Sequence, residues 1–454
     1  MNGGDDGDEG EGEGAEGEGE EGEGEGEGDL PECARLGDDV VIEDASDLAS
    51  VVGCTELGDV LVGAPELTSL AGLESLVHIR GQLFISGQST SLMSLDGLNA
   101  LETVDAQLVI QGTPAITNVN ALAALTSVGA LAINGNDALV DVSGLAGLTS
   151  IGGYFSVNNN DALTSFDLPG LVDVLGDISF NGNSALERLD GFAVLESVGG
   201  SINVVNNYGL TAVDGFNALR SVGLTVEIRE NDAILSIDGF NLVEEIGRDL
   251  NILGEDALQS LAGFGALTNV GVMLQLRGLG PITSIEGLSS LERVGFTLAI
   301  GGAGDLTNLD NFSSVTEIAG FFDIGGATSL VDVDGLSSLV SVGEGFILSY
   351  ADSLQNVDGL SALTSVGGDF SLGNNLLLTN LDGLGSLTTI GGDLTVTTMP
   401  ALVDIDGFAQ LESVGGEVVF DLCAQLANCA AEALAARLGT TCTCTFNDEA
   451  ATCP

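Results

Sequence analysis

A strict internal repeat constrains the fold of this chain more than any other feature of its sequence. In most repeats an aliphatic residue precedes one or two small residues, usually glycine, as in the stretch LTSVGGDFSLGNNLLLTNLDGL (363–384). Fifteen such aliphatic positions are called anchors below, and they are Ile79, Val104, Val128, Ile151, Val174, Val198, Val222, Ile246, Val270, Val294, Ile318, Val342, Val366, Ile390 and Val414. The numbers of successive anchors differ by 25, 24, 23 and 23, and then by 24 ten times in succession. A period this strict predicts stacked repeats that share one core.

Each unit also repeats its apolar positions, at offsets 0, +4, +6, +12, +15, +18 and +21 from the anchor. The pair at +4 and +6, such as Phe370 and Leu372, has the period of two that marks a short strand with one buried face. No stretch between these strands is long enough for a regular helix. The sequence therefore predicts an all-β solenoid of about fifteen coils, in which each strand pairs with the strands of neighbouring coils.

The ends of the chain differ from the repeats. Residues 1–29 are almost entirely acidic residues and glycine, which predicts a disordered tether, or alternatively an inert solubilising tail. Residues 30–78 are expected to form the N-terminal capping coils and 79–420 the solenoid. Residues 421–454 are expected to form a C-terminal cap, with an Ala/Leu-rich helix over 421–439 and several cysteines.

The charge excludes some partners. The net charge is −59, and the nine basic residues are all arginine, so binding to nucleic acid or to an anionic membrane is not expected. No run of 18 apolar residues occurs, and no signal peptide follows Met1. Because the cysteines described next indicate export, we expect an export signal upstream of this chain, with lipid or tether anchoring as an open possibility.

The seven cysteines lie outside the repeats. They are Cys33, Cys54, Cys423, Cys429, Cys442, Cys444 and Cys453. Terminal clusters are typical of disulfide-stapled caps in an oxidising compartment, which predicts an extracellular or cell-surface protein. The odd cysteine is either free or joins two chains. A zinc site made by Cys429, Cys442 and Cys444 is an alternative with non-standard spacing, and no metal or cofactor is predicted.

Catalytic constellations are hard to find. His78 is the only histidine, so no Ser-His-Asp or Cys-His arrangement is expected, and the protein is predicted not to be an enzyme. The abundant carboxylates keep a polysaccharide-active enzyme as an alternative. Aspartates that precede glycine at +16 are predicted to cap turns, with the glycine permitting a positive φ there, and cation binding is the alternative. Asparagines at +9 are predicted to satisfy the backbone of a bend. An ice-binding threonine face at +13 is too irregular to be favoured.

The outward face of the strands is the predicted binding surface. Positions +3, +5 and +7 are mostly small or acidic, but the middle coils carry larger and charged residues. The candidate binding residues are Thr225, Glu227, Arg229, Asn251, Met273, Gln275 and Arg277. Mixed charged and polar side chains on adjacent strands are typical of a recognition surface, whereas the alternative is a solvated face with internal ion pairs.

The stretch ECARLGDDVVIEDASDLASVVGCTELGDVLV (32–62), followed by units of the form L..VGG.L.I..N..L..LDGL, resembles the receptor L domain. The resemblance covers about residues 33–420 and implies a right-handed, leucine-rich-repeat-like parallel β-helix, with a Cys33–Cys54 disulfide closing the first coil. It also implies non-enzymatic recognition or adhesion of a protein or glycan at the cell surface. The chain has more coils than a receptor L domain and lacks the other receptor modules, so a growth-factor-receptor role is not expected. A structural envelope protein is the remaining alternative.

Overall fold

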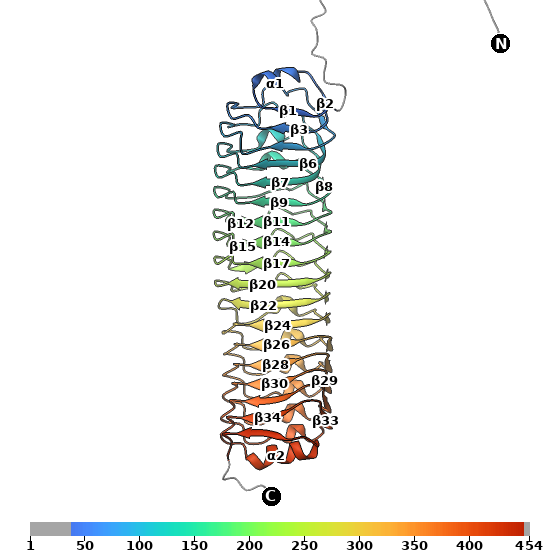
Figure 1. Cartoon of the computed structure of the whole chain (residues 1–454), viewed down its shortest axis with the longest axis vertical. Helices are drawn as coiled ribbons and strands as arrows, with labels where there is room; N and C mark the ends of the chain where they lie inside the picture. Colours follow the sequence, from blue (N-terminus) through green and yellow to red (C-terminus); the bar gives the residue numbers. More distant parts are fainter. Residues whose placement is uncertain (1–37, 449–454) are drawn as a thin grey trace, which may run out of the picture.

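The computed structural model describes residues 38–448, which form an elongated stack of coils with the N-terminal and C-terminal coils at opposite ends (Figure 1). Each coil contributes one strand to a main column, where it pairs in parallel with the equivalent strands of the coils before and after. In β17 and β20, for example, Val226 lies opposite Leu250, the equivalent residue of the next coil. The all-β parallel solenoid predicted from the period is therefore confirmed. The expected tether (1–29), Cys33 and Cys453 lie outside the described residues.

The main column consists of β1 (Val40–Ile42), β3 (Val60–Val62), β5 (Leu83–Ile85), β6 (Thr103–Gln111), β7 (Ser127–Asn134), β9 (Phe155–Asn158), β11 (Ile178–Asn181), β14 (Ile202–Val205), β17 (Val226–Arg229), β20 (Asp249–Glu255), β22 (Met273–Leu279), β24 (Thr297–Gly301), β26 (Phe322–Gly325), β28 (Phe346–Ser349), β30 (Phe370–Gly373), β32 (Leu394–Thr397), β34 (Val418–Asp421) and β35 (Cys442–Thr445). The corner column of short strands contains the anchors other than Val104 and Val128, which lie in β6 and β7. It consists of β2 (Glu56–Leu57), β4 (His78–Ile79), β8 (Ser150–Ile151), β10 (Asp173–Val174), β13 (Ser197–Val198), β16 (Ser221–Val222), β19 (Glu245–Ile246), β21 (Asn269–Val270), β23 (Arg293–Val294), β25 (Glu317–Ile318), β27 (Ser341–Val342), β29 (Ser365–Val366), β31 (Thr389–Ile390) and β33 (Ser413–Val414).

The remaining elements are short. A small sheet is formed by β12 (Arg188–Leu189), β15 (Ala212–Val213) and β18 (Ser236–Ile237). Single 3₁₀ turns are η1 (Asn120–Leu122), η2 (Ser143–Leu145), η3 (Glu286–Leu288), η4 (Asp310–Phe312), η5 (Asp334–Leu336), η6 (Asp358–Leu360), η7 (Asp382–Leu384) and η8 (Asp406–Phe408). The helices α1 (Ala45–Ser50) and α2 (Asn428–Arg437) lie at the two ends of the stack (Figure 1).

The core follows the predicted apolar positions. In the coil that begins at Val366, the side chains of Val366, Phe370 and Leu372 are at most 1% exposed. Burying one such side chain stabilises the fold by roughly 1.5–3 kcal/mol. Because every coil has the same buried positions, equivalent side chains stack: the rings of Phe240 and Phe264 are parallel within 3°, with centroids 5.1 Å apart. The core is thus a set of side-chain columns that exist only when coils stack.

The described residues that are both buried and polar all belong to one column, at offset +9 in the regular coils. They are Ser89, Thr113, Asn136, Asn160, Asn183, Asn207, Asn231, Glu255 and Asn375. In this Asn ladder, Asn183 Oδ1 accepts from the backbone N–H of Asn160 (3.1 Å), and Asn183 Nδ2 donates to the carbonyl of Val157 (2.8 Å). The amides satisfy backbone groups of a bend that no strand partner reaches, as the sequence predicted.

The aspartates at +16 were predicted to cap their turns, but in the structure a different side chain caps them. The backbone N–H of Asp382 donates to the side chain of Asn380 (3.1 Å), and the same pattern recurs at +14 in other coils, so the +14 side chain caps the 3₁₀ turn. Gly383 has no positive φ. A Cβ there would lie 1.9 Å from the carbonyl oxygen of Val357 in the preceding coil. Gly383 is needed for close stacking of coils rather than for a left-handed turn, which corrects the expected reason at this position, whereas Gly97, which follows Asp96, does have a positive φ of 114°.

The C-terminal cap is built into the last coil. The helix is α2, shorter than the predicted 421–439, and it replaces the turns between β34 and β35. Strand β35 still pairs with β34 in the register of the other coils, with Val418 opposite Cys442. The solenoid register therefore continues past residue 420, where the sequence placed its end. The physical reason is that the buried columns are continued by residues such as Leu426 and Ala431, which are 0% exposed.

Candidate functional site on the exposed sheet face

Six of the seven candidate residues lie on three adjacent strands of the main column, and Thr225 directly precedes the first of these strands. Residues of β17, β20 and β22 align so that Glu227, Asn251 and Gln275 form one row. Arg229 and Arg277 lie in a second row, on either side of Leu253. We call these three strands and their outward side chains the mixed patch. The structure thus confirms that the predicted residues are neighbours, whereas their binding role stays a prediction.

Ion pairs hold both arginines of the mixed patch. Arg229 Nε lies 3.6 Å from a carboxylate oxygen of Glu227 and 3.9 Å from one of Glu230. Arg277 Nη2 lies 2.7 Å from Asp323, two coils further on, and reaches it by passing over Gly301. The two arginine side chains remain 43% and 44% exposed. The patch therefore presents partly neutralised charges that are still accessible to a partner.

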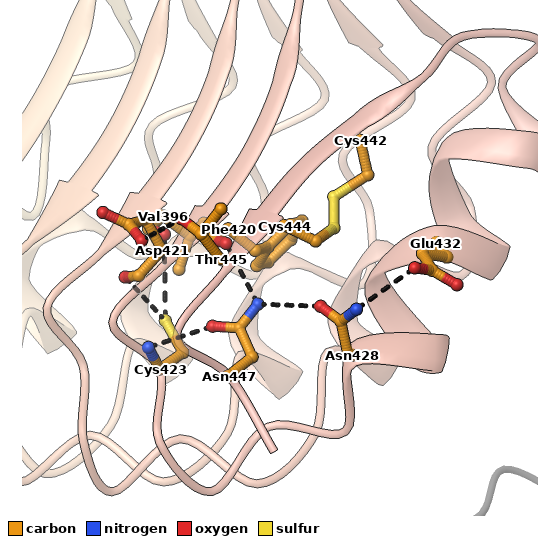
Figure 2. Close-up of a disulfide and its surroundings, with 10 residues drawn as sticks. All are labelled: Val396, Phe420, Asp421, Cys423, Asn428, Glu432, Cys442, Cys444, Thr445 and Asn447. Atoms are coloured by element: carbon orange, nitrogen blue, oxygen red, sulfur yellow. Dashed lines mark hydrogen bonds between the residues drawn. A yellow bond between two sulfur atoms is a disulfide. The ribbon is translucent and has the colours of Figure 1, made fainter. Parts of the chain in front are cut away.

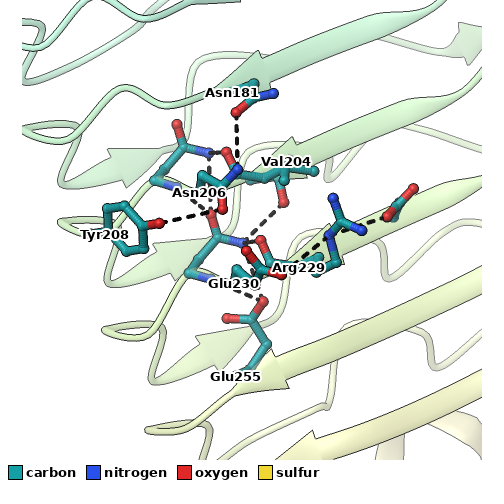
Figure 3. A network of polar contacts seen from close by, with 11 residues as sticks. Asn181, Val204, Asn206, Tyr208, Arg229, Glu230 and Glu255 are labelled. Carbon is teal, nitrogen blue, oxygen red and sulfur yellow. Dashed lines mark hydrogen bonds and ion pairs between the residues drawn. The ribbon is translucent and has the colours of Figure 1, made fainter.

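The strands under the mixed patch are unusual. β20 and β22 are each seven residues long, whereas most strands of the main column have four. At the end of β20, Glu255 takes the place of an asparagine in the Asn ladder and accepts from Asn231 Nδ2 (3.2 Å) (Figure 3). Burial raises the pKa of Glu255 to about 8, against the opposing effect of the hydrogen bonds from Asn231. A protonated carboxylic acid is therefore built into the coil beneath the patch at neutral pH.

The turns that directly follow the main-column strands near the mixed patch carry exposed polar side chains. In several coils one residue here adopts a left-handed conformation, for example Asn206 (φ 58°) and Glu230 (φ 55°). Asn206 Nδ2 donates to Asn181 (3.4 Å), and the Tyr208 hydroxyl donates to Asn206 (3.5 Å) (Figure 3). Asparagine tolerates this conformation better than other non-glycine residues do. The polar surface thus extends from the mixed patch around the edge of the sheet.

A second surface, which the sequence reasoning missed, lies in the N-terminal coils. Between β6 and β7 the register shifts, because Asp105 and Ala106 lie opposite the single residue Gly129. In most other coils a corner separates the corner-column strand from the main-column strand, whereas β6 and β7 are each one continuous strand through this corner. A hollow of about 680 Å³ opens beside this bulge, with Gln82 and Gln107 among its lining residues. We call it the bulge hollow. The signal for it in the sequence is the irregular spacing of the first anchors.

A chain of hydrogen bonds crosses the bulge hollow. The hydroxyl of Tyr154 donates to Gln107 Oε1 (2.8 Å), passing over the small, buried Ala130 of the intervening coil. Gln107 Nε2 donates to Gln82 Oε1 (2.8 Å), and Gln82 Nε2 lies 3.5 Å from Asp59 Oδ2. These residues come from four different coils and align only because the coils stack. The position of Tyr154 on the outward face was visible in the sequence, but its partners were not.

Two basic side chains next to the bulge hollow, those of His78 and Arg80, lie against carboxylates. His78 Nε2 lies 3.0 Å from Asp105, and Arg80 forms an ion pair with Glu56. His78 thus contacts carboxylates, not a serine or cysteine that it could activate. Among residues 38–448 no group of three or more His, Cys, Asp or Glu side chains is placed to hold a metal ion. Elsewhere in the stack, the aspartates at +16 of successive coils lie in one column. Burial and the neighbouring carboxylates raise the pKa of one of them, Asp334.

The cysteines of the C-terminal cap correct two expectations. Cys442 and Cys444 form a disulfide with each other within β35 (Figure 2), so neither supplies a thiolate to the zinc alternative. Cys423 is free and buried, and it is therefore not a staple of the cap. Its sulfur occupies the Asn-ladder position, 3.5 Å from the carbonyl of Asp421 and 3.7 Å from that of Val396. Cys54 and Cys429 are disulfide-bonded.

Comparison with known proteins assigns this chain to no family. No family model and no curated protein matches the chain. One solved structure, described as the crystal structure of a TLR13–ssRNA13 complex, is similar over 84% of this chain at 16% sequence identity and a TM-score of 0.34. The match spans 59% of the TLR13 chain, less than two thirds of its length. The strand pairing described above defines this protein as a parallel β-solenoid. Within residues 38–448, no helix combines the length and apolar character needed to cross a membrane.

Proposed function

We propose that the protein is a non-enzymatic recognition or adhesion scaffold of the receptor L-domain type, which binds its partner on the mixed patch. The observation that carries this proposal is the alignment of Glu227, Asn251 and Gln275, flanked by two exposed arginines, on three adjacent strands. Repeat solenoids use extended faces of this kind for binding. The rigid strands hold the side chains in place before a partner arrives, which lowers the entropic cost of association.

The proposed location is the cell surface or the extracellular space. It is supported by the disulfide between Cys442 and Cys444 and by the disulfide-bonded state of Cys54 and Cys429, because such bonds persist in oxidising compartments. Mass mapping of the protein purified from its source without reducing agent tests this proposal. Free thiols at all of these positions would contradict it.

A capture experiment tests the binding proposal. The immobilised full chain is exposed to an envelope fraction of the source organism, and retained proteins and glycans are identified by mass spectrometry. Arg229→Ala/Arg277→Ala should lose a partner that the wild type retains. Arg220→Ala/Arg293→Ala is the matched control, since it makes the same charge change beside or within corner-column strands, away from the mixed patch. Equal retention by all three proteins would contradict the proposal.

A further inference from the structure

We infer that the bulge hollow is a binding site for an uncharged oligosaccharide, separate from the mixed patch. The hydrogen bonds that cross the bulge hollow all run in one direction along the stack. Tyr154 donates to Gln107, Gln107 donates to Gln82, and Gln82 donates toward Asp59. A side-chain amide has two N–H donors and an oxygen with two lone pairs. Gln82 and Gln107 therefore each keep one N–H donor and one oxygen lone pair that a ligand can use.

A ligand for such a row must donate and accept at closely spaced positions. Hydroxyl groups do both, and a saccharide carries them on neighbouring carbons. Gln82 and Gln107 lie on adjacent coils, which are about 4.8 Å apart, close to the length of one pyranose unit. An oligosaccharide lying along the axis of the solenoid would thus meet one glutamine per sugar. Tyr154, 41% exposed at the border of the hollow, adds an aromatic face for sugar C–H groups.

The charges around the bulge hollow select against anionic ligands. Asp59 and Asp105 line it, whereas the guanidinium of Arg80 is engaged in an ion pair with Glu56. An anionic ligand would be repelled by the two aspartates without a free cation to compensate. The small residues Gly129 and Ala130 leave the space open that a larger side chain would fill. The hollow is therefore polar, unfavourable to anions and open along the solenoid.

Calorimetric titration of the full chain tests the inference. The probes are cellohexaose, chitohexaose, maltohexaose, laminarihexaose and mannohexaose, with an oligogalacturonate as the anionic comparator. We expect at least one neutral probe to bind, and Gln82→Ala/Gln107→Ala to weaken it at least about tenfold because hydrogen bonds are lost. Tyr154→Phe, which removes one hydroxyl and keeps the ring, should weaken it by a smaller factor. Gln111→Ala is the control, since this glutamine lies on β6 outside the hollow.

The possible results separate the two proposals. Arg229→Ala/Arg277→Ala should leave saccharide binding unchanged, so loss of a partner there and loss of saccharide binding here are independent. Unchanged thermal unfolding of each variant shows that the coils remain folded. The inference is overturned if none of the neutral probes binds at millimolar concentration, if the double glutamine variant binds as the wild type does, or if only the oligogalacturonate binds.

Discussion

Glu255 should make the stability of the solenoid depend on pH in a direction opposite to that of a typical surface carboxylate. The side chain is 0% exposed, and only its Oε1 is hydrogen-bonded, to the backbone N–H (3.3 Å) and Nδ2 (3.2 Å) of Asn231. Its Oε2 is buried without a hydrogen-bond partner. Burial therefore raises the pKa of Glu255 from 4.5 to about 8, and the negative charges of Asp232 and Asp256 act in the same direction.

The sign of the effect follows from proton linkage. Below pH 4.5 the carboxyl group is protonated in both the folded and the unfolded chain, so its ionisation costs no stability. Between pH 4.5 and 8 the unfolded chain loses this proton and the folded chain keeps it. The free energy of unfolding then falls by about 1.4 kcal/mol per pH unit, and by about 5 kcal/mol in total. Above pH 8 no further loss is expected from this group.

Replacing Glu255 with glutamine tests this reasoning, because Gln has the same shape and cannot ionise. The free energy of unfolding is measured by urea denaturation, followed by circular dichroism, at pH 5, 6, 7 and 8. The free energy of unfolding of Glu255→Gln should rise relative to that of the wild type by about 1.4 kcal/mol for each unit increase in pH. Comparing the two proteins at each pH cancels the contributions of the other carboxylates.

A nearby exposed carboxylate provides the control. The side chain of Glu230, in the preceding coil, is 56% exposed, so Glu230→Gln should change stability by nearly the same amount at each pH. Glu255→Asn gives an independent check, because an asparagine here would extend the Asn ladder, with the carbonyl of Ile228 as the equivalent acceptor. If Glu255→Gln and wild type had parallel pH profiles, Glu255 would titrate like an exposed carboxylate, and the account of this coil would be refuted.

Three further outcomes are expected. Gly383→Ala should cost about 3 kcal/mol, because its Cβ would meet the backbone of the preceding coil, whereas Gly385→Ala, with its nearest atom at 3.4 Å, should be nearly neutral in the same urea assay. Asn207→Ala should cost at least about 3 kcal/mol, because it leaves buried N–H and C=O groups without partners; a smaller loss would mean that water replaces the amide. The thiol of Cys423, whose pKa burial raises to about 11, should react with a thiol reagent such as Ellman's reagent only after denaturation, and a fast reaction in the native protein would contradict its burial.

The candidate surfaces could be predicted from the sequence only in part. The mixed patch was visible because residues one period apart must be neighbours in a regular stack, so Glu227, Asn251 and Gln275 align without any structural information. The bulge hollow was not, because irregular spacing breaks this rule, and the contact between Tyr154 and Gln107 crosses two coils. Its only trace in the sequence was the departure of the first anchors from the regular period.

The period alone determined that the chain forms a parallel solenoid, which positions are buried, and that one polar column satisfies a bend, since equal spacing gives equivalent residues equal surroundings. Only the tertiary structure decided questions that depend on distances between coils. It assigned Gly383 to close coil stacking and Asn380 to the turn cap, placed Cys423 in the Asn ladder, and buried Glu255 without a second partner. These outcomes follow from how closely one coil lies against the next, which the sequence of a single coil does not contain.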